Sequence, residues 1–441
     1  MLLVYTPKIT NRAGFSFNLI FNNILNVDFE ITTDSNLFTK YTGAKICYNT
    51  SKICDNSIFV KSTQLLFKHS IDTLNPECFS YEGIPAFFGT NNKDADMPFD
   101  IFAASFFLAS RYEEYLPFRI NEYGCYLAYD SFAYRNGFLD IPIIDIWAWK
   151  LATIISHNFP QLKIPKKRFE FISTVNIGQA YKYKRIGLLR TAYGYCHDIA
   201  KRDWPHVKQR SRVLLNKQAD PYDNYEHIVE ISRKHGTKTL FWSLMCDYSP
   251  YDHNISYRNE HLRNTLKRLA DYGKVGISLS YESTGLLQKQ EAETERLDNV
   301  LHKPIIRSRF NYQRFHLPTD YKNLTKIGIE KDFSMGYHNA VGFRAGTCTP
   351  FHFFNIIANR EYNLLVYPTP IPESIFVDHT PDETLNVFKE IIKTISSVDG
   401  TFVSTWKSEY FTDKTYMDIY EEVLALCRNI KENNQPQINK S

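Results

Sequence analysis

Hydrophobic and polar residues follow alternating helical and strand patterns in the second half of the chain. Residues 225–234 (YEHIVEISRK) have the pattern of an amphipathic helix that ends before Gly236, and the apolar run 239–245 follows as an expected strand. Residues 257–272 and 275–279 repeat this order. Further helices are expected at 286–301, 322–329, 382–397 and from 416, and further strands at 363–367 and 401–406. Such an order is typical of βα units around a mostly parallel sheet, so we expect an α/β barrel-like domain here.

The first 160 residues lack this regular order. Short runs at 2–5 and 57–60 have the character of strands, and an apolar helix is expected over 99–115, before Pro117. The basic, proline-containing segment 161–168 (QLKIPKKR) is the expected boundary between two domains. We therefore predict a smaller α+β domain at 1–165, a (β/α) barrel at 166–432 and a disordered polar tail at 433–441.

The predicted strand order also locates the site. In open or closed parallel sheets, ligands bind where the carboxyl ends of the strands meet the loops that follow. Functional residues are therefore expected just after Val175, Ile277, Val366 and Thr405.

Composition narrows the class of protein. A formal charge of +4 over 441 residues argues against a dedicated nucleic-acid binder, whose affinity depends on many phosphate contacts. The aromatic content of 15% suits a surface that stacks on sugars, or a core rich in ring edges. Eight scattered cysteines without a Cys-x-x-Cys pair are expected to be reduced thiols. The first residues lack the features of a secretory signal and no apolar run is long enough for a membrane span, so a cytoplasmic protein is expected.

One segment is strongly basic. Residues 181–217 contain ten Lys or Arg against two Asp, interleaved with aromatic residues. Contact with an anionic surface, such as membrane lipid or an acidic glycan, is one interpretation. A solvated helical connection is favoured instead, because the sequence indicates no strong apolar face opposite the basic one.

Five sequence strings extend over both parts of the chain. They are FDIFAASFFLASRYEEYLP (99–117), FAYRNGFLDIPIIDIW (132–147), FISTVNIGQAYKYK (171–184), GFRAGTCTPF (342–351) and GTFVSTWKSE (400–409). On these strings the sequence resembles two-domain bacterial proteins in which a poorly characterised N-terminal domain precedes a polysaccharide deacetylase barrel of the carbohydrate esterase family four type. The resemblance implies a distorted (β/α) barrel whose usual members remove acetyl groups from N-acetylated sugars.

In that family the chemistry needs five groups. One Asp and two His hold a divalent metal that polarises the amide carbonyl and binds a water molecule. A second Asp accepts the proton of this water, and another His protonates the departing amine.

The resemblance implies that all five positions are altered here. Within the string TVNIG, Asn176 stands at the position of the base and Gly178 at that of the metal-binding Asp. Ser278 and Asn311 stand at the positions of the metal-binding His residues, and Lys407 at that of the acid. An amide does not accept a proton at neutral pH, a hydroxyl is a poor ligand beside imidazole, and glycine has no side chain.

Framework residues around these positions are retained, so we predict a non-catalytic member that binds a glycan or amino sugar without a metal or other cofactor. The expected ligand-binding cleft consists of Asp247, Tyr281, Arg309, Arg344, Tyr367 and Trp406, of which Tyr367 takes the place of a family His. A metal-dependent deacetylase that holds zinc or another divalent metal with unorthodox ligands stays open. A different set of groups at the same cleft, with Asp247, Asp252 and Glu373 as candidates, also stays open. Lys407 would be its acid if burial lowers its pKa. A scaffold or regulatory partner of an active paralogue, contacting it through the N-terminal domain, is the other alternative.

Overall fold

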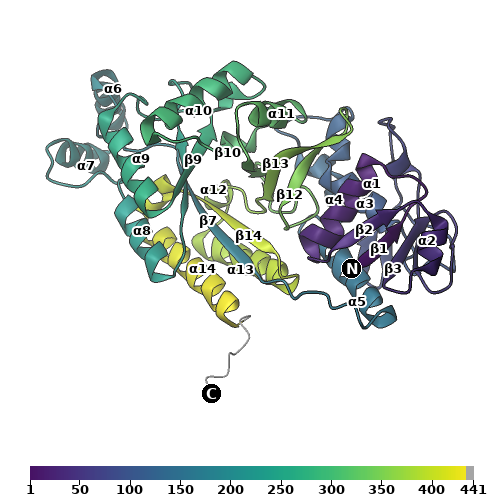
Figure 1. Cartoon of the computed structure of the whole chain (residues 1–441). Helices are drawn as coiled ribbons and strands as arrows, with labels where there is room; N and C mark the ends of the chain where they lie inside the picture. Colours follow the sequence, from purple (N-terminus) through teal and green to yellow (C-terminus); the bar gives the residue numbers. More distant parts are fainter. Residues whose placement is uncertain (434–441) are drawn as a thin grey trace.

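One eight-stranded sheet organises the second half of the chain in the computed structural model, which describes residues 1–433 (Figure 1). The strands are β7 (Glu170–Ile177), β8 (Leu240–Leu244), β9 (Lys274–Leu279), β10 (Arg307–Phe310), β11 (Lys331–Met335), β12 (Phe351–Asn355), β13 (Arg360–Pro368) and β14 (Thr401–Lys407). Their order is β12-β13-β11-β10-β9-β8-β7-β14, and each neighbouring pair is parallel except β12 and β13. Because β12 and β14 are the edges, the predicted barrel is an open, curled half-barrel.

Helices cover the outer face of this sheet (Figure 1). They are α8 (Tyr225–Lys234), α9 (Glu260–Tyr272), α10 (Leu287–Leu301), α11 (Thr319–Lys326), α13 (Pro381–Ser397) and α14 (Lys414–Asn433). The short α12 (Ile375–Asp378) follows β13, and α6 (Leu188–Ala200) and α7 (Trp204–Leu214) form a hairpin that projects from the sheet (Figure 1). Helix α13 begins with a capping box formed by Thr380 and Glu383, and its Phe388 packs on Phe402 and Trp406 of β14. The predicted alternation of helices and strands is confirmed for this half of the chain.

The N-terminal part contains a second sheet, of four strands in the order β2-β1-β3-β4. The strands are β1 (Leu2–Tyr5), β2 (Phe29–Thr32), β3 (Lys45–Asn49) and β4 (Ile58–Lys61), with a separate pair β5 (Phe79–Tyr81) and β6 (Ile84–Ala86). The helices are α1 (Asn11–Phe17), α2 (Ser35–Lys40), α3 (Ile101–Ala109), α4 (Phe132–Arg135) and α5 (Ile143–Asn158). All three pairings in the four-stranded sheet are parallel, so the predicted α+β arrangement is wrong for this sheet.

Helix α3 explains the apolar segment seen in the sequence. Every residue from Ile101 to Ala109 is buried, which is the state of a helix that is hydrophobic on all sides. The predicted helix over 99–115 ends early, because Arg111 adopts a left-handed conformation (φ 56°) and a 3₁₀ turn follows at Tyr112–Tyr115. This turn places Glu114 in the interior of the molecule.

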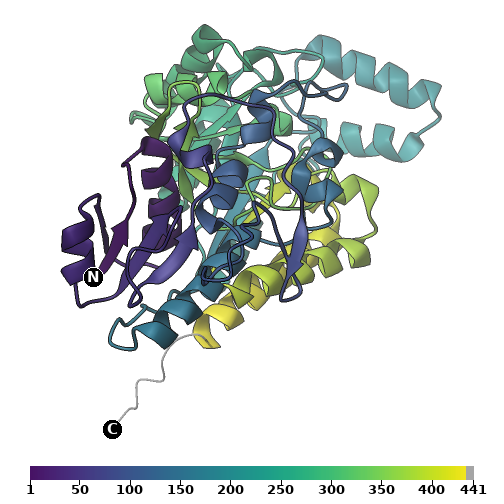
Figure 2. The same cartoon turned by 90° about the vertical axis from the view of Figure 1, so that its right-hand side faces the viewer.

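The two parts of the chain lie side by side (Figure 2), and one continuous hydrophobic core extends through both. The carboxylate of Asp145 on α5 accepts hydrogen bonds from the hydroxyls of Thr347 and Thr349, both at 2.6 Å. Glu114 forms a second buried link with Arg344. The division at residue 165 stays a prediction, since both parts contribute to the same core.

The remaining predictions concern the cysteines, membrane-spanning segments and the C-terminal tail. Within residues 1–433 all eight cysteines are free thiols. Among the described residues, no helix is long and apolar enough to cross a membrane. The predicted tail begins at Asn433, the last residue of α14, and its remaining residues 434–441 lie outside the described part.

Candidate functional site

Glu373, in the loop after β13, is the centre of a polar cluster at the carboxyl ends of the strands. Asn176, near the end of β7, donates from Nδ2 to Glu373 Oε1 at 3.2 Å. Arg309 of β10 forms an ion pair with the same oxygen through Nη1. Lys407, the last residue of β14, places Nζ 3.2 Å from Glu373 Oε2. In the sheet Asn176 and Lys407 are register partners, so the two strand ends hold them side by side.

Glu373 and Lys407 are both charged at neutral pH. Burial opposes ionisation of Glu373, but Arg309 and Lys407 outweigh it and lower the pKa of the carboxyl to about 2. The Glu373 carboxylate in turn raises the pKa of Lys407 above its usual value, against the effect of burial. The pKa of Lys407 is therefore shifted in the direction opposite to the one that a catalytic acid at this position requires.

A second cluster lies around Asp252. Its Oδ1 accepts a hydrogen bond from Asn311 Nδ2 at 2.9 Å, and its Oδ2 accepts one from the Tyr281 backbone N–H at 3.0 Å. Burial raises the pKa of Asp252, and these hydrogen bonds oppose the increase. The hydroxyl of Ser278 is buried and has no hydrogen-bond partner within the described residues.

Aromatic rings form a wall beside the two clusters. The ring of Tyr312 stacks on that of Tyr123 with centroids 5.9 Å apart and an interplanar angle of 5°, and it meets Tyr281 edge to face at 6.0 Å. Tyr281 itself stacks on Tyr251 at 3.9 Å. Tyr312 has a positive φ of 58°, which is an unusual backbone conformation for this residue type. Its hydroxyl donates a hydrogen bond to the Tyr251 carbonyl at 2.8 Å, which fixes the position of the ring.

A cavity of about 650 Å³ opens between these groups. Its lining includes Arg309, Tyr312, Glu373 and Lys407 from the half-barrel and Tyr123 from the N-terminal part. The N-terminal part thus forms one side of the cleft. Sequence reasoning missed Tyr123 and Tyr312; Tyr312 follows Asn311 directly, but nothing in the sequence signals that Tyr123 would reach the site.

The structure brings together only some of the predicted cleft residues. Arg309 lies in the cleft, and Tyr281 belongs to its aromatic wall. Asp247 is mostly exposed and pairs with Arg296 at 2.9 Å, beside a smaller cavity. Arg344 is buried against Glu114. Trp406 is fully buried on the helix side of β14, outside the lining of the cleft.

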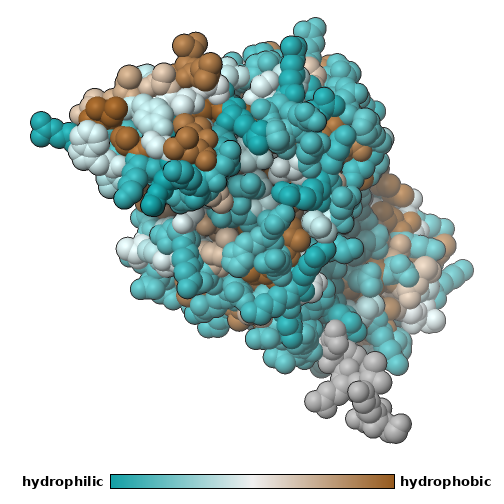
Figure 3. All heavy atoms as spheres, turned by 90° about the vertical axis from the view of Figure 1, so that its left-hand side faces the viewer, coloured by the Kyte–Doolittle hydropathy of each residue, from teal (hydrophilic) through white to brown (hydrophobic). Residues whose placement is uncertain are grey.

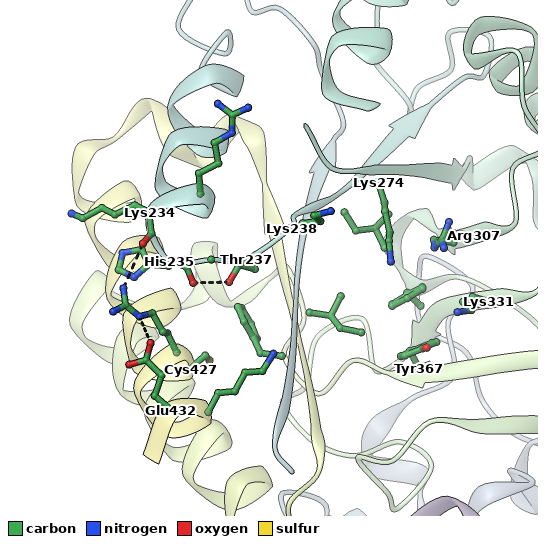
Figure 4. A pocket seen from close by; sticks show the side chains of 18 residues that line it. Lys234, His235, Thr237, Lys238, Lys274, Arg307, Lys331, Tyr367, Cys427 and Glu432 are labelled. Atoms are coloured by element: carbon green, nitrogen blue, oxygen red, sulfur yellow. Dashed lines mark hydrogen bonds and ion pairs between the residues drawn. The ribbon is translucent and has the colours of Figure 1, made fainter. Parts of the chain in front are cut away.

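Tyr367, the next-to-last residue of β13, contributes to a different cavity. Its ring stacks on Phe333 at 4.4 Å and lines a cavity of about 670 Å³ near the amino ends of the strands (Figure 4). Lys274, Arg307 and Lys331, the first residues of β9, β10 and β11, line the same cavity. Burial and the neighbouring cations lower the pKa of Lys274. Tyr367 is therefore separated from the cleft that holds Glu373.

The residues at the family's metal positions do not fit a divalent metal. A Cβ placed on Gly178 would lie 2.6 Å from Glu409 Oε1, so the Glu409 carboxylate already occupies the space of a side chain there. This oxygen accepts the backbone N–H of Gln179 at 2.8 Å, and the side-chain N–H of Asn311 is directed to Asp252. Within residues 1–433, no group of three or more His, Cys, Asp or Glu is arranged to hold a metal ion.

Comparisons with known proteins give one family match and several similar structures. Residues 2–160 match a family of unknown function, DUF7033. A search of curated proteins finds no match. Among solved structures, the chain is similar to a protein described as a polysaccharide deacetylase from Mycobacterium smegmatis (11% identity, TM-score 0.40, 60% of this chain and 86% of that one). It is also similar to the allantoinase Puue (8%, 0.39, 60% and 85%) and to a protein described as a polysaccharide deacetylase from Pseudomonas aeruginosa PAO1 (8%, 0.38, 61% and 93%). At these TM-scores the similarities do not indicate a function for this chain.

Proposed function

We propose that this protein binds a glycan or amino-sugar ligand in the cleft around Glu373 and does not hydrolyse it. The observation that carries the proposal is the pairing of fixed ionic groups with an aromatic wall in one cavity. Lys407 is partly exposed and presents N–H donors to a ligand, and Tyr123 and Tyr312 offer ring faces. The hydroxyl groups of a sugar can accept hydrogen bonds from Lys407, and its C–H faces can stack on the two tyrosine rings. The sequence resemblance to polysaccharide deacetylases supports this ligand class.

The absence of hydrolysis is part of the same proposal. A general base works best when its pKa lies near the working pH, whereas the pKa of Glu373 is lowered to about 2 and Asn176 has an amide in place of a carboxylate. Lys407 holds its proton too tightly to be an efficient acid. Gly178, where the family has a metal ligand, faces the carboxylate of Glu409.

The test is a titration of the purified protein with N-acetylglucosamine oligomers by calorimetry, combined with an assay for released acetate and with elemental analysis. We expect saturable binding, no acetate and no stoichiometric metal. Tyr312→Ala should weaken binding about tenfold through loss of ring stacking. Tyr272→Ala, which removes an exposed tyrosine on α9, is the matched control and should bind as the parent does. Acetate release with bound metal would favour the deacetylase alternative, and absence of binding would refute the proposal.

A further inference from the structure

Helix α6 exposes its apolar side to solvent. Leu188 is 90% exposed, Leu189 88% and Tyr193 73%, and these positions recur at the spacing of one helix face. Within the described chain no residue of α6 is buried. The apolar side of an amphipathic helix normally packs on the rest of the protein. In α6 the apolar side faces solvent instead.

The opposite, more polar side of α6 packs on α7. Arg210 Nη2 lies 2.8 Å from Asp198 Oδ2, and the hydroxyls of Tyr195 and Ser211 lie 2.9 Å apart. A Cβ on Gly194 would lie 2.4 Å from Arg210 Nη1, so the guanidinium of Arg210 lies directly against the Gly194 backbone. These contacts fix which side of α6 faces outward.

Apolar exposure continues beyond α6. Trp204, the first residue of α7, is 61% exposed, and Leu215, just after α7, is 65% exposed. Figure 3 shows hydrophobic side chains gathered on the projecting corner of this face, among strongly hydrophilic surroundings. The α6–α7 hairpin, residues 188–214, projects from the body of the molecule (Figures 1 and 2).

The charge of the segment indicates what covers this face. Residues 181–217 contain ten Lys or Arg and two Asp, a formal charge of +8, and the hairpin itself (188–214) contains six Lys or Arg and two Asp, a formal charge of +4. Lys201 and Arg202, which follow α6, and Arg212 on α7 are exposed cations of this segment. A second copy of the same hairpin would bring the same positive charge, and the two copies would repel each other. An anionic lipid surface can contact the cations through its headgroups and the apolar side chains through its acyl chains.

We infer that the α6–α7 hairpin docks on an anionic phospholipid surface. Leu188, Leu189 and Tyr193 enter the boundary between headgroups and acyl chains, while the surrounding Lys and Arg residues contact the headgroups. The hairpin lies in the connection from β7 to α8, so it leaves the sheet at the carboxyl end of β7, the edge that also holds Asn176. Docking would therefore hold the cleft edge of the half-barrel near the membrane. This inference does not depend on the ligand of the cleft.

Sedimentation of the full chain with vesicles tests the inference. We expect binding to vesicles of phosphatidylglycerol and phosphatidylcholine, weak binding to phosphatidylcholine alone, and a decrease with added salt. Leu188→Glu should reduce binding to the anionic vesicles about tenfold. Ile357→Glu introduces the same charge at an apolar residue 69% exposed in the β12–β13 turn, and it should leave binding unchanged.

Three results would overturn the inference. They are absence of binding to anionic vesicles, an equal loss in Leu188→Glu and Ile357→Glu, and a dimer in solution that Leu188→Glu dissociates. The last result, measured by light scattering, would show that a second copy covers the apolar face. The substituted side chains are mostly exposed, so circular dichroism is expected to show an unchanged fold for both variants.

Discussion

Arg344 and Glu114 form a buried ion pair between the half-barrel and the N-terminal part, with Arg344 Nη2 2.6 Å from Glu114 Oε2 and Arg344 Nε donating to Oε1 at 2.9 Å. Arg111 Nε pairs with the same carboxylate at 2.8 Å. Burial raises the pKa of Glu114, but the two guanidinium groups outweigh it and lower the pKa to about 2. Glu114 thus pairs with both buried cations, and Glu113 gives Arg111 a second counter-charge, with its Oε2 3.7 Å from Arg111 Nη2.

Substitution Glu114→Gln should destabilise the protein strongly. It leaves Arg111 and Arg344 buried with reduced compensation, which costs about 3–5 kcal/mol. Urea unfolding followed by tryptophan fluorescence measures the loss. Glu82→Gln breaks a largely exposed pair with Lys150 and should cost less than about 1 kcal/mol. Similar small losses in both variants would contradict a central role for Glu114.

Glu373→Gln should destabilise the cleft in a pH-dependent way. The lowered pKa of Glu373 means that its ionised form stabilises the fold above the unfolded pKa near 4.5, and that this contribution disappears as pH falls through about 2. The stability difference between the parent and Glu373→Gln should therefore be large at pH 7 and small near pH 2. Asp378→Asn, at an exposed residue lining the same cavity, should show little difference at either pH. A difference that does not change with pH would refute the ionic role of Glu373.

Glu293 on α10 should produce the opposite dependence on pH. Burial raises its pKa from 4.5 to about 7, helped by Asp252 and opposed by hydrogen bonds from Ser280. Between these values the folded state binds more protons than the unfolded state, so this group's contribution makes the free energy of unfolding decrease as pH rises, by about 3 kcal/mol. Glu293→Gln should remove that part of the slope in urea titrations between pH 5 and 8. Glu295→Gln, on the exposed side of the same helix, should leave the slope intact.

Gly178→Ala should destabilise the protein through a local collision. Its Cβ would lie 2.6 Å from Glu409 Oε1, and displacing this carboxylate also disturbs its hydrogen bond from Gln179, so we expect a loss of about 1–3 kcal/mol. Gly14→Ala in α1 is the matched control: nothing lies within 4 Å of its Cβ, and alanine favours the helix by about 0.5–1 kcal/mol. Calorimetric melting compares the two. An unchanged melting temperature for Gly178→Ala would show that Glu409 moves freely.

The sequence by itself determined the order of helices and strands in the second half, because each amphipathic helix carries its 3.6-residue period wherever it packs. It also located Asn176 and Lys407 at strand ends, and the parallel register of β7 and β14 brings them together. The strands β10 (RSRF) and β11 (KDFSM) escaped prediction because their interior positions are polar. Ser308 of β10 is buried there with a hydrogen bond to Asp332 of the neighbouring strand, and Ser334 donates to the same carboxylate from within β11.

Only the tertiary structure decided which side of each strand or helix faces the cleft, the core or solvent. Successive strand residues point to opposite faces, so Lys407 reaches the cleft while Trp406 lies among the helices, and the sequence alone does not show which face is inside. Similarly, the sequence of 181–217 indicated no strong apolar face, whereas in the structure the contacts of α6 with α7 leave Leu188, Leu189 and Tyr193 outside. Local periodicity is a property of the chain, whereas the identity of the covering surface depends on elements distant in sequence.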